Sequence, residues 1–250
     1  MSKFKKVVRH WLMAFIHPRP LIGLLFLPRF FMHYFKYVQA SGGSGPTFRD
    51  MQPCLGDWTT HTPFDAHYFY QGAWLARRLA SSAPSKHTDI GSSVLTIGVL
   101  SAQVETVFVD FRPIQTNLSG LTPVAGNILA LTFADHSIES LSCLHVLEHI
   151  GLGRYGDPID PMGSRKGAAE LQRVMATGGR LYLSLPVGRE RVCFNAHRVH
   201  APASVLDMFP QMKLLEFSWV DDAGRFLEST AVAEANQQEY GCGLFVFEKL

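Results

Sequence analysis

Three titratable side chains, His145, Glu148 and His149, follow directly after an apolar run at residues 138–144. Histidine is the commonest general base at neutral pH, and a neighbouring carboxylate can orient its ring. We therefore interpret His149 as a base that takes a proton from a hydroxyl group, with Glu148 orienting it. A structural alternative stays open, because glutamate is also favoured at the start of a helix, where it meets the positive end of the helix dipole.

The same histidines could instead suggest a metal site. His145 and His149 are four residues apart, and Cys193, His197 and His200 form a second cluster. Zinc-binding helices of the HExxH type place a glutamate directly after the first histidine, and this sequence has valine there. We also expect His145 to belong to the preceding strand, which would break the helical spacing. The sequence therefore predicts no metal.

A second group of residues could hold a nucleoside. The run HTDIGSS at residues 87–93 contains Asp89 and Gly91, and the apolar segment VFV at residues 107–109 ends at Asp110. An acidic residue about twenty positions after a glycine-containing turn can accept hydrogen bonds from both ribose hydroxyls. We expect Asp110 to do so and the adjacent Arg112 to contact an adenosine.

These residues need a scaffold, and residues 137–186 predict one. An apolar strand at residues 138–144 precedes a loop rich in glycine, proline and aspartate and then a helix that Ser164 can cap. We expect the glycines at 178–179 to end that helix and a strand at residues 181–185 to follow. This is a βαβ unit, whose ligands bind at the carboxyl ends of the strands.

The rest of the chain continues the alternation of helix and strand. A helix over residues 68–79 has an aromatic face, and the polar tips of His67, Tyr68 and Gln71 could reach the site. Further elements are expected at residues 124–131 (strand), 202–209 (helix), 213–220 (strand) and 243–249 (strand). The predicted fold class is α/β: a doubly wound, mostly parallel sheet of strand order 3-2-1-4-5-7-6 with helices on both faces and a basic, apolar N-terminal arm.

Several short sequence motifs between residues 137 and 186 resemble those of class I S-adenosylmethionine-dependent methyltransferases. VLEHI at residues 146–150, ELQRVM at residues 170–175 and the following Gly-Gly match the second half of that Rossmann-like fold. The loop GLGRYGDPIDP and the later run FNAHRVH are similar to a methyltransferase-like family of unknown function associated with bacterial surface-polysaccharide genes. The resemblance covers residues 53–250.

This resemblance implies S-adenosylmethionine as the cofactor. The superfamily loop reads DxGxGxG, and here Ser93 and Leu95 stand where later glycines would be. Asn127 falls where the superfamily often has an aspartate that reads adenine. The cofactor-binding residues implied are Asp89, Gly91, Ser92, Ser93, Asp110, Arg112, Asn127 and His145, and the substrate-binding residues are Tyr68, Tyr155, Asp157, Asn195, His197 and Arg198.

The N-terminal part of the chain differs in composition from the rest. Residues 1–40 carry seven of the 23 basic residues and none of the 21 acidic ones, interleaved with Trp, Phe and Leu. The remainder, with 16 basic and 21 acidic residues, has a net charge of −5. The Gly/Ser run SGGSGP predicts a boundary between an arm at residues 1–46 and a domain at residues 47–250. We expect residues 1–40 to bind an anionic membrane surface, or alternatively a protein.

Two functions remain open at this point. One is a methyltransferase that acts on a sugar or lipid-linked glycan in surface-polysaccharide synthesis. The other is a non-catalytic module of the same fold that docks to membrane-associated machinery. The acidic body argues against a nucleic-acid partner, and four widely spaced cysteines suit a reducing compartment. We expect a cytoplasmic protein, peripheral at the inner face of the membrane, of open oligomeric state.

Overall fold

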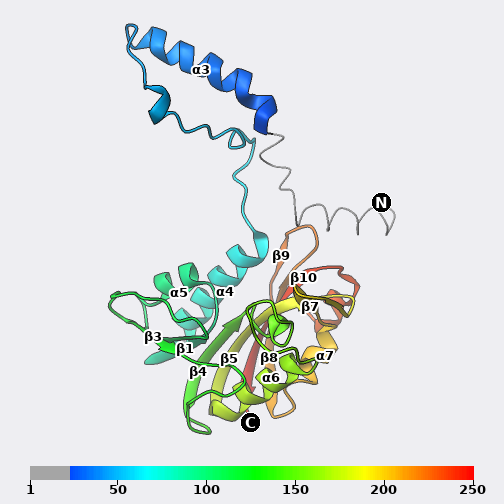
Figure 1. Cartoon of the computed structure of the whole chain (residues 1–250). Helices are drawn as coiled ribbons and strands as arrows, with labels where there is room; N and C mark the ends of the chain where they lie inside the picture. The colour runs from blue at the N-terminus through cyan, green and yellow to red at the C-terminus, as the bar shows by residue number, and fades with distance from the viewer. Residues whose placement is uncertain (1–22) are drawn as a thin grey trace. The chain divides into compact units, whose positions relative to one another are not determined.

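The computed structural model describes residues 23–250. The chain divides into two compact units, an N-terminal unit, Met1–Phe64, and a C-terminal unit, Asp65–Leu250 (Figure 1). The sequence placed the boundary at residues 46–47, whereas residues 47–64 lie within the N-terminal unit. Five of the seven basic residues expected to bind a membrane lie outside the described residues: Lys3, Lys5, Lys6, Arg9 and Arg19.

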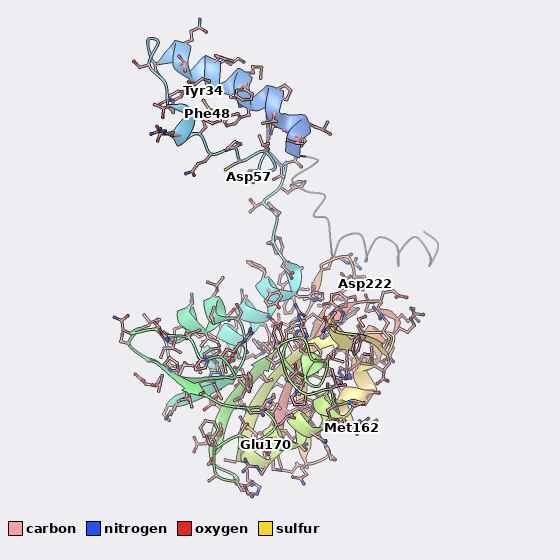
Figure 2. All side chains as sticks on the ribbon, viewed as in Figure 1. Tyr34, Phe48, Asp57, Met162, Glu170 and Asp222 are labelled. Carbon is pink, nitrogen blue, oxygen red and sulfur yellow. The ribbon has the colours of Figure 1, made fainter. Side chains whose placement is uncertain are left out.

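In residues 23–64 of the N-terminal unit, the long helix α3 (Leu27–Ala40) lies between the short 3-10 helices η1 (Leu24–Phe26) and η2 (Phe48–Asp50). Proline in its first turn starts α3, because the fixed φ of proline suits that position. The chain then returns along the helix, where the Tyr34 hydroxyl donates to the Pro46 carbonyl at 3.1 Å (Figure 2). No residue of α3 is buried. Within residues 23–250, no helix is long and apolar enough to cross a membrane.

The C-terminal unit is built on an eight-stranded sheet of order β3-β2-β1-β4-β5-β10-β8-β9. Strands β3, β2, β1, β4 and β5 pair in parallel with one another, whereas β10 pairs antiparallel with β5 and β8, and β9 pairs antiparallel with β8. The elements of this sheet are β1 (Lys86–Ile90), β2 (Glu105–Asp110), β3 (Leu121–Ala125), β4 (Ile138–Leu144), β5 (Met175–Val187), β8 (Met212–Val220), β9 (Phe226–Leu227) and β10 (Gly241–Lys249). The other elements are α4 (Ala66–Ser82), α5 (Val94–Leu100), η3 (Leu147–His149), α6 (Gly163–Val174), α7 (Pro202–Leu206), η4 (Val232–Gln237) and the hairpin of β6 (Arg191–Cys193) and β7 (His197–Val199).

The predicted sheet order is confirmed, with β9 as a short additional edge strand. The decisive neighbours are β1 and β4, which pair in parallel with Thr88 opposite Leu141. The reversal of winding therefore falls between β1 and β4. A crevice opens at such a point because the flanking connections leave the sheet on opposite faces.

Two apolar layers cover the two faces of the sheet. One layer packs Leu171 of α6 against strand residues such as Leu181 and Leu183. The other packs Trp74 and Leu75 of α4 against residues such as Tyr182. Consecutive residues of β5 thus point to opposite layers, as the period of a strand requires. Both faces of the sheet are covered, so most residues of the central strands β1 and β4 are buried, including polar ones such as His87 and Asp89.

The connection from β4 to β5 departs from the sequence analysis at both ends of α6. Ser164 does not cap the helix, which begins one residue earlier; its hydroxyl instead donates to the Leu147 carbonyl at 2.6 Å and ties α6 to η3. The glycines at 178–179 do not end the helix either, because α6 stops at Val174. They lie within β5 at an irregularity of its pairing with β4, and Gly178 has a φ of 76°.

Three other predicted boundaries shift. The third strand ends at Ala125, because a turn follows in which Asn127 and Ala130 form an isolated bridge. The predicted helix at 202–209 is shortened to α7 and continues as turns. His145 lies one residue beyond β4 with a φ of 55°, so it is not part of the strand.

Candidate active site

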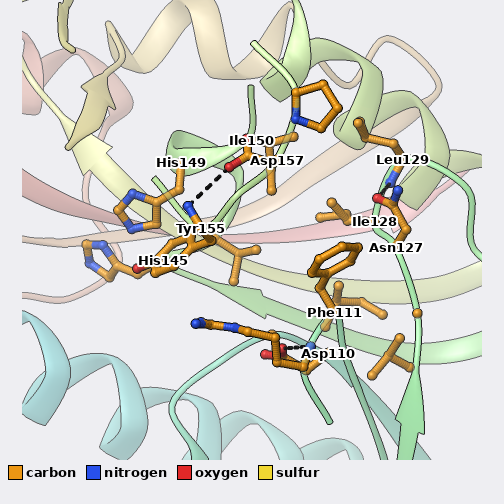
Figure 3. Close-up of a pocket in the computed structure, with 17 residues that line it drawn as sticks. Asp110, Phe111, Asn127, Ile128, Leu129, His145, His149, Ile150, Tyr155 and Asp157 are labelled. Carbon is orange, nitrogen blue, oxygen red and sulfur yellow. Dashed lines mark hydrogen bonds between the residues drawn. The ribbon is translucent and has the colours of Figure 1, made fainter. Parts of the chain in front are cut away.

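A cavity of about 200 Å³ lies at the carboxyl ends of β1, β2, β3 and β4 (Figure 3). The parallel register of these strands brings their ends to one edge of the sheet. We call this the crevice. Residues from the predicted cofactor set that line it are Gly91, Asp110, Arg112, Asn127 and His145; Tyr155 and Asp157 of the predicted substrate set and the predicted base His149 line it as well.

Gly91 and Asp110 form the part of the crevice closest to β1 and β2. Gly91 has a φ of 67°, and a Cβ there would lie 3.3 Å from the Val146 side chain and 3.8 Å from Oδ2 of Asp110. One carboxylate oxygen of Asp110 accepts a hydrogen bond from the Arg112 backbone N–H at 2.7 Å (Figure 3). Glycine thus keeps the backbone open to a ligand where Oδ2 can still accept a hydrogen bond.

Asp89, Ser92 and Ser93 do not line the crevice. Asp89 is fully buried and accepts hydrogen bonds from the Ser92 backbone at 3.0 Å, the Ser92 hydroxyl at 2.6 Å and the Ser142 hydroxyl. Burial raises the pKa of this carboxyl to about 6, against the effect of these hydrogen bonds. Ser93 precedes α5 as its N-cap residue without a capping hydrogen bond. Asp89 and Ser92 therefore stabilise the turn after β1 and do not contact a ligand in the crevice.

Asn127 and the loop after η3 close the far side of the crevice. Oδ1 of Asn127 accepts a hydrogen bond from the Leu129 N–H at 2.9 Å, which fixes the direction of the amide. Asp157 accepts hydrogen bonds from the Gly151 N–H at 2.6 Å and the Tyr155 N–H at 3.3 Å. Burial would raise the pKa of Asp157, but these backbone donors hold it below its ordinary value.

Arg112 reaches across the crevice toward the same loop. Its guanidinium lies 4.9 Å from the centre of the Tyr155 ring, and the Arg154 guanidinium lies 5.1 Å from that ring. A cation over an aromatic face within about 6 Å is attracted by the ring quadrupole. The predicted contact of Arg112 with an adenosine remains a prediction, but the structure gives this side chain a protein partner at the crevice.

A second cavity, of about 480 Å³, adjoins the crevice, and we call it the side cavity. His145 and His149 line both cavities and so stand between them. The side cavity is lined by Asp65, His67, Tyr68, His145, Glu148, His149, Arg154, Asn195, Ala196, His197 and Tyr240. Three of the predicted substrate residues, Tyr68, Asn195 and His197, therefore meet here.

His149 is held in one orientation by the loop before β7. Its Nδ1 lies 2.6 Å from the Ala196 carbonyl, which can only accept, so Nδ1 carries the proton and Nε2 the lone pair. Burial lowers the pKa of His149, and the nearby Glu148 only partly opposes this. At neutral pH the ring is therefore uncharged and able to take a proton.

Glu148 interacts mainly with His145. Its Oε1 accepts a hydrogen bond from Nδ1 of His145 at 2.7 Å, whereas Nε2 of His149 is 3.7 Å away. Burial would raise the pKa of this fully buried carboxyl, but His145 lowers it below its ordinary value. The structure thus has Glu148 orient His145 and not, as predicted, His149.

Arg198, predicted to bind substrate, lies in neither cavity lining. It is 6% exposed and donates to the Ile150 carbonyl at 2.6 Å, the Asp160 carbonyl at 3.1 Å and the Ser164 hydroxyl at 3.2 Å. Its five donors suit such a set of acceptors. Arg198 clamps the loop between η3 and α6, and so supports the wall of the crevice indirectly.

The residues that the sequence analysis missed lie far apart along the chain. Asp65 caps α4, where its side chain accepts from the Tyr68 N–H, and Tyr240 precedes β10. The Tyr240 ring lies 5.2 Å from that of His67 and 4.9 Å from that of His197, measured between ring centres. Asp65 could have been recognised from the sequence as a helix-capping residue, because aspartate is favoured at that position. No sequence pattern around Tyr240 predicts that its side chain lines the side cavity.

Comparisons with known proteins identify a family and a fold. The family model DUF268, described as a Caenorhabditis protein of unknown function, matches residues 90–250, and no curated protein matches the chain. The solved structure of the N-methyltransferase NodS from Bradyrhizobium japonicum, in complex with S-adenosyl-L-homocysteine, is 16% identical with a TM-score of 0.50; 79% of this chain and 91% of that one are covered.

Two further solved structures extend the comparison. The cyclase SpnF is 11% identical with a TM-score of 0.53, covering 72% of this chain and 80% of that one. The YcgJ protein of Bacillus subtilis is 13% identical with a TM-score of 0.50, covering 72% and 98%. At these identities the likeness shows the fold alone, which is the Rossmann-like fold of class I methyltransferases.

Proposed function

The chain belongs to the DUF268 family, and we propose that its C-terminal unit transfers a methyl group from S-adenosylmethionine to an acceptor that carries a hydroxyl group. The fold alone supports no particular reaction, since one similar structure is an N-methyltransferase and another a cyclase. The proposal rests on one observation: two cavities meet at His145 and His149, and His149 presents an uncharged, oriented ring between them.

The crevice suits the nucleoside part of the cofactor. Asp110 offers a carboxylate oxygen at the end of β2, and Gly91 leaves the backbone of the neighbouring turn accessible. Asp110 would hold the ribose hydroxyls, Gly91 would face the methionine side, and Asn127 would lie near the adenine. Bound in this way, S-adenosylmethionine supplies an electrophilic methyl group on a sulfonium.

The side cavity suits the acceptor. Its lining combines charged and amide groups such as Asp65, Arg154 and Asn195 with the aromatic rings of Tyr68 and Tyr240. Polar groups fix the orientation of a hydroxyl-rich ligand, and aromatic rings cover its apolar faces. We propose a sugar or lipid-linked glycan as the acceptor class, of the kind used in surface-polysaccharide synthesis. Nε2 of His149 would take the hydroxyl proton as the oxygen is methylated.

Calorimetric titration of the full chain with S-adenosylmethionine tests the proposal. Asp110→Ala should lose about 2–4 kcal/mol of binding free energy, because two hydrogen bonds to a charged group are lost. This corresponds to roughly thirty- to several-hundred-fold in affinity. The control is Glu139→Gln, which changes an exposed carboxylate on β4 outside both cavity linings. Equal binding by wild type and Asp110→Ala would contradict the assignment of Asp110.

The alternative is a non-catalytic module that docks to membrane-associated machinery. It would replace the enzyme proposal if wild type failed to bind S-adenosylmethionine even at millimolar concentration. The exposed residues of the N-terminal unit support binding to a membrane surface, whether the protein is an enzyme or a docking module. α3 exposes Phe31, Met32 and Phe35 and carries the basic residues Arg29 and Lys36. We propose that this helix lies on an anionic membrane surface.

A further inference from the structure

Three possible metal ligands converge at the side cavity, and two of them belong to its lining. They are His67 on α4, His145 after β4 and Cys242 on β10, and one donor atom from each lies within 4.8 Å of the other two. We call these residues the His–His–Cys cluster. The histidine and cysteine spacings in the sequence point to other combinations, and none of these includes His67 or Cys242.

A hydrogen bond at Nδ1 orients the His145 ring so that Nε2 is available to a metal. Nδ1 is engaged with Oε1 of Glu148 at 2.7 Å, and Glu148 is fully buried. A carboxylate that accepts from Nδ1 fixes the ring and leaves Nε2 as the donor atom for a metal. This carboxylate–histidine pair is the usual support of a zinc-bound histidine.

Nε2 of His145 has no hydrogen-bond partner among the described residues, although the His145 side chain is only 5% exposed. Buried polar atoms are nearly always hydrogen-bonded, so an orphaned one calls for an unseen partner. The rings of His67 and Tyr68 stack on His145, with centres 5.6 Å and 5.5 Å away. They restrict the directions in which this nitrogen can find a partner.

Cys242 completes the cluster from within the sheet. It is a free thiol with no exposed surface, and β10 holds it between Pro186 of β5 and Val220 of β8. Its position is therefore rigid. His67 is only partly buried and sits in the first turn of α4, so its side chain can adjust. Donor atoms around zinc are about 3.5 Å apart, given bond lengths of about 2.0–2.3 Å. A shift of about 1 Å, chiefly by His67, would close the site.

We infer that the His–His–Cys cluster binds a divalent transition metal, with Zn²⁺ as the best match. One thiolate and two imidazoles select zinc over magnesium or calcium, which prefer oxygen ligands. Three protein ligands leave a fourth position, and His67 and His145 both line the side cavity, so that position opens toward it. If the proposed function holds, an oxygen of the acceptor would occupy the fourth position.

Cobalt titration of the full chain tests the inference. The protein is first stripped with a chelator and then titrated with Co²⁺, whose bond to a thiolate produces a charge-transfer absorption band in the near ultraviolet. We expect one equivalent of Co²⁺ to bind with this band and one equivalent of Zn²⁺ to displace it. Cys242→Ser should remove the band. Cys193→Ser, which alters a partly exposed thiol outside the cluster, should keep it.

The variant Glu148→Gln tests whether Glu148 orients the metal ligand His145 without itself binding the metal. The ligands remain, so the band should persist while the affinity for Co²⁺ falls about 10- to 100-fold, the usual effect of losing a supporting carboxylate. The wild-type titration needs no variant to fold: if it shows no charge-transfer band, the inference is wrong. A band of full intensity in Cys242→Ser would overturn it as well. S-adenosylmethionine is absent throughout, so the result is independent of the proposed function.

Discussion

The Ser92 hydroxyl donates a hydrogen bond to Oδ2 of Asp89 at 2.6 Å, and the Ser92 hydroxyl oxygen in turn accepts a hydrogen bond from the Leu144 N–H at 3.0 Å. Ser92 thereby ties the turn after β1 to the end of β4, the two strands that flank the reversal of the sheet. The side chains of Asp89 and Ser92 thus fix the turn that contains Gly91, and neither of them lines the crevice.

Ser92→Ala should destabilise the protein by about 1–3 kcal/mol, because it removes one of the three hydrogen bonds to the buried Asp89 carboxylate and takes away the acceptor of the Leu144 N–H. Urea unfolding followed by circular dichroism measures the change. Ser93→Ala is the matched control, since Ser93 makes no capping hydrogen bond, and should change stability by less than about 0.5 kcal/mol. Equal losses in the two variants would refute the role of Ser92.

Asp89 should make stability depend on pH in an unusual direction. Burial raises the pKa of this carboxyl to about 6 from its ordinary 3.8, so the folded state binds the proton more tightly than the unfolded state. Its contribution is complete below pH 3.8 and is lost as pH rises through 6. The full span is about 3 kcal/mol, from two pKa units at about 1.4 kcal/mol each.

Asp89→Asn isolates this effect from other titrating groups. His87, whose pKa burial lowers to about 4, acts in the opposite direction in both proteins and so cancels in the difference. Relative to wild type, Asp89→Asn should therefore gain about 2–3 kcal/mol on going from pH 4 to pH 7. Urea unfolding at a series of pH values gives this difference, and a constant difference across the series would contradict the argument.

Gly91→Ala should impair both stability and binding in the crevice. A Cβ at a φ of 67° is strained and would lie 3.3 Å from Val146. We expect a loss of about 1–2 kcal/mol in stability and at least tenfold weaker S-adenosylmethionine binding, measured by unfolding and calorimetry. Gly98→Ala is the control: it lies in α5 with nothing within 4 Å of a new Cβ, and alanine there should stabilise by about 0.5–1 kcal/mol. Similar effects of both substitutions would contradict this prediction.

The exposed face of α3 should govern membrane binding. Phe35, 65% exposed, would insert its ring among lipid chains, and replacing it by serine should cost about 1.5 kcal/mol, or about tenfold in partitioning. Co-sedimentation of the full chain with vesicles containing phosphatidylserine measures this. Val99→Ser changes a residue of the C-terminal unit that is 71% exposed and should have no effect.

Two further comparisons test the membrane proposal as a whole. Binding should weaken as salt rises, because the charges of an exposed helix are screened. A chain that starts at Thr47 should sediment less than the full chain. Equal recovery of the two chains would exclude the N-terminal segment as the membrane-binding part.

The sheet and the crevice could be predicted from the sequence because both depend on local patterns. Apolar runs of strand length, separated by helical periodicity, leave few ways to wind a parallel sheet, so the neighbours β1 and β4 followed from the chain itself. The same winding brings the ends of β1, β2 and β3 to one edge. Gly91 and Asp110 could therefore be predicted from their positions at strand ends, whereas Asn127 was implied by the family resemblance, and all three line the crevice.

What only the tertiary structure decided is where each polar side chain points and what it meets. Asp89 and Asp110 both come from strand ends, yet one is buried under hydrogen bonds and the other lines the crevice. Arg198 was predicted to bind substrate, but its guanidinium donates to the Ile150 and Asp160 carbonyls and so holds the loop between η3 and α6. His67, His145 and Cys242 come together only because α4 packs over strands β4 and β10, which are distant in sequence. Such encounters are set by packing between elements, and no local periodicity encodes them.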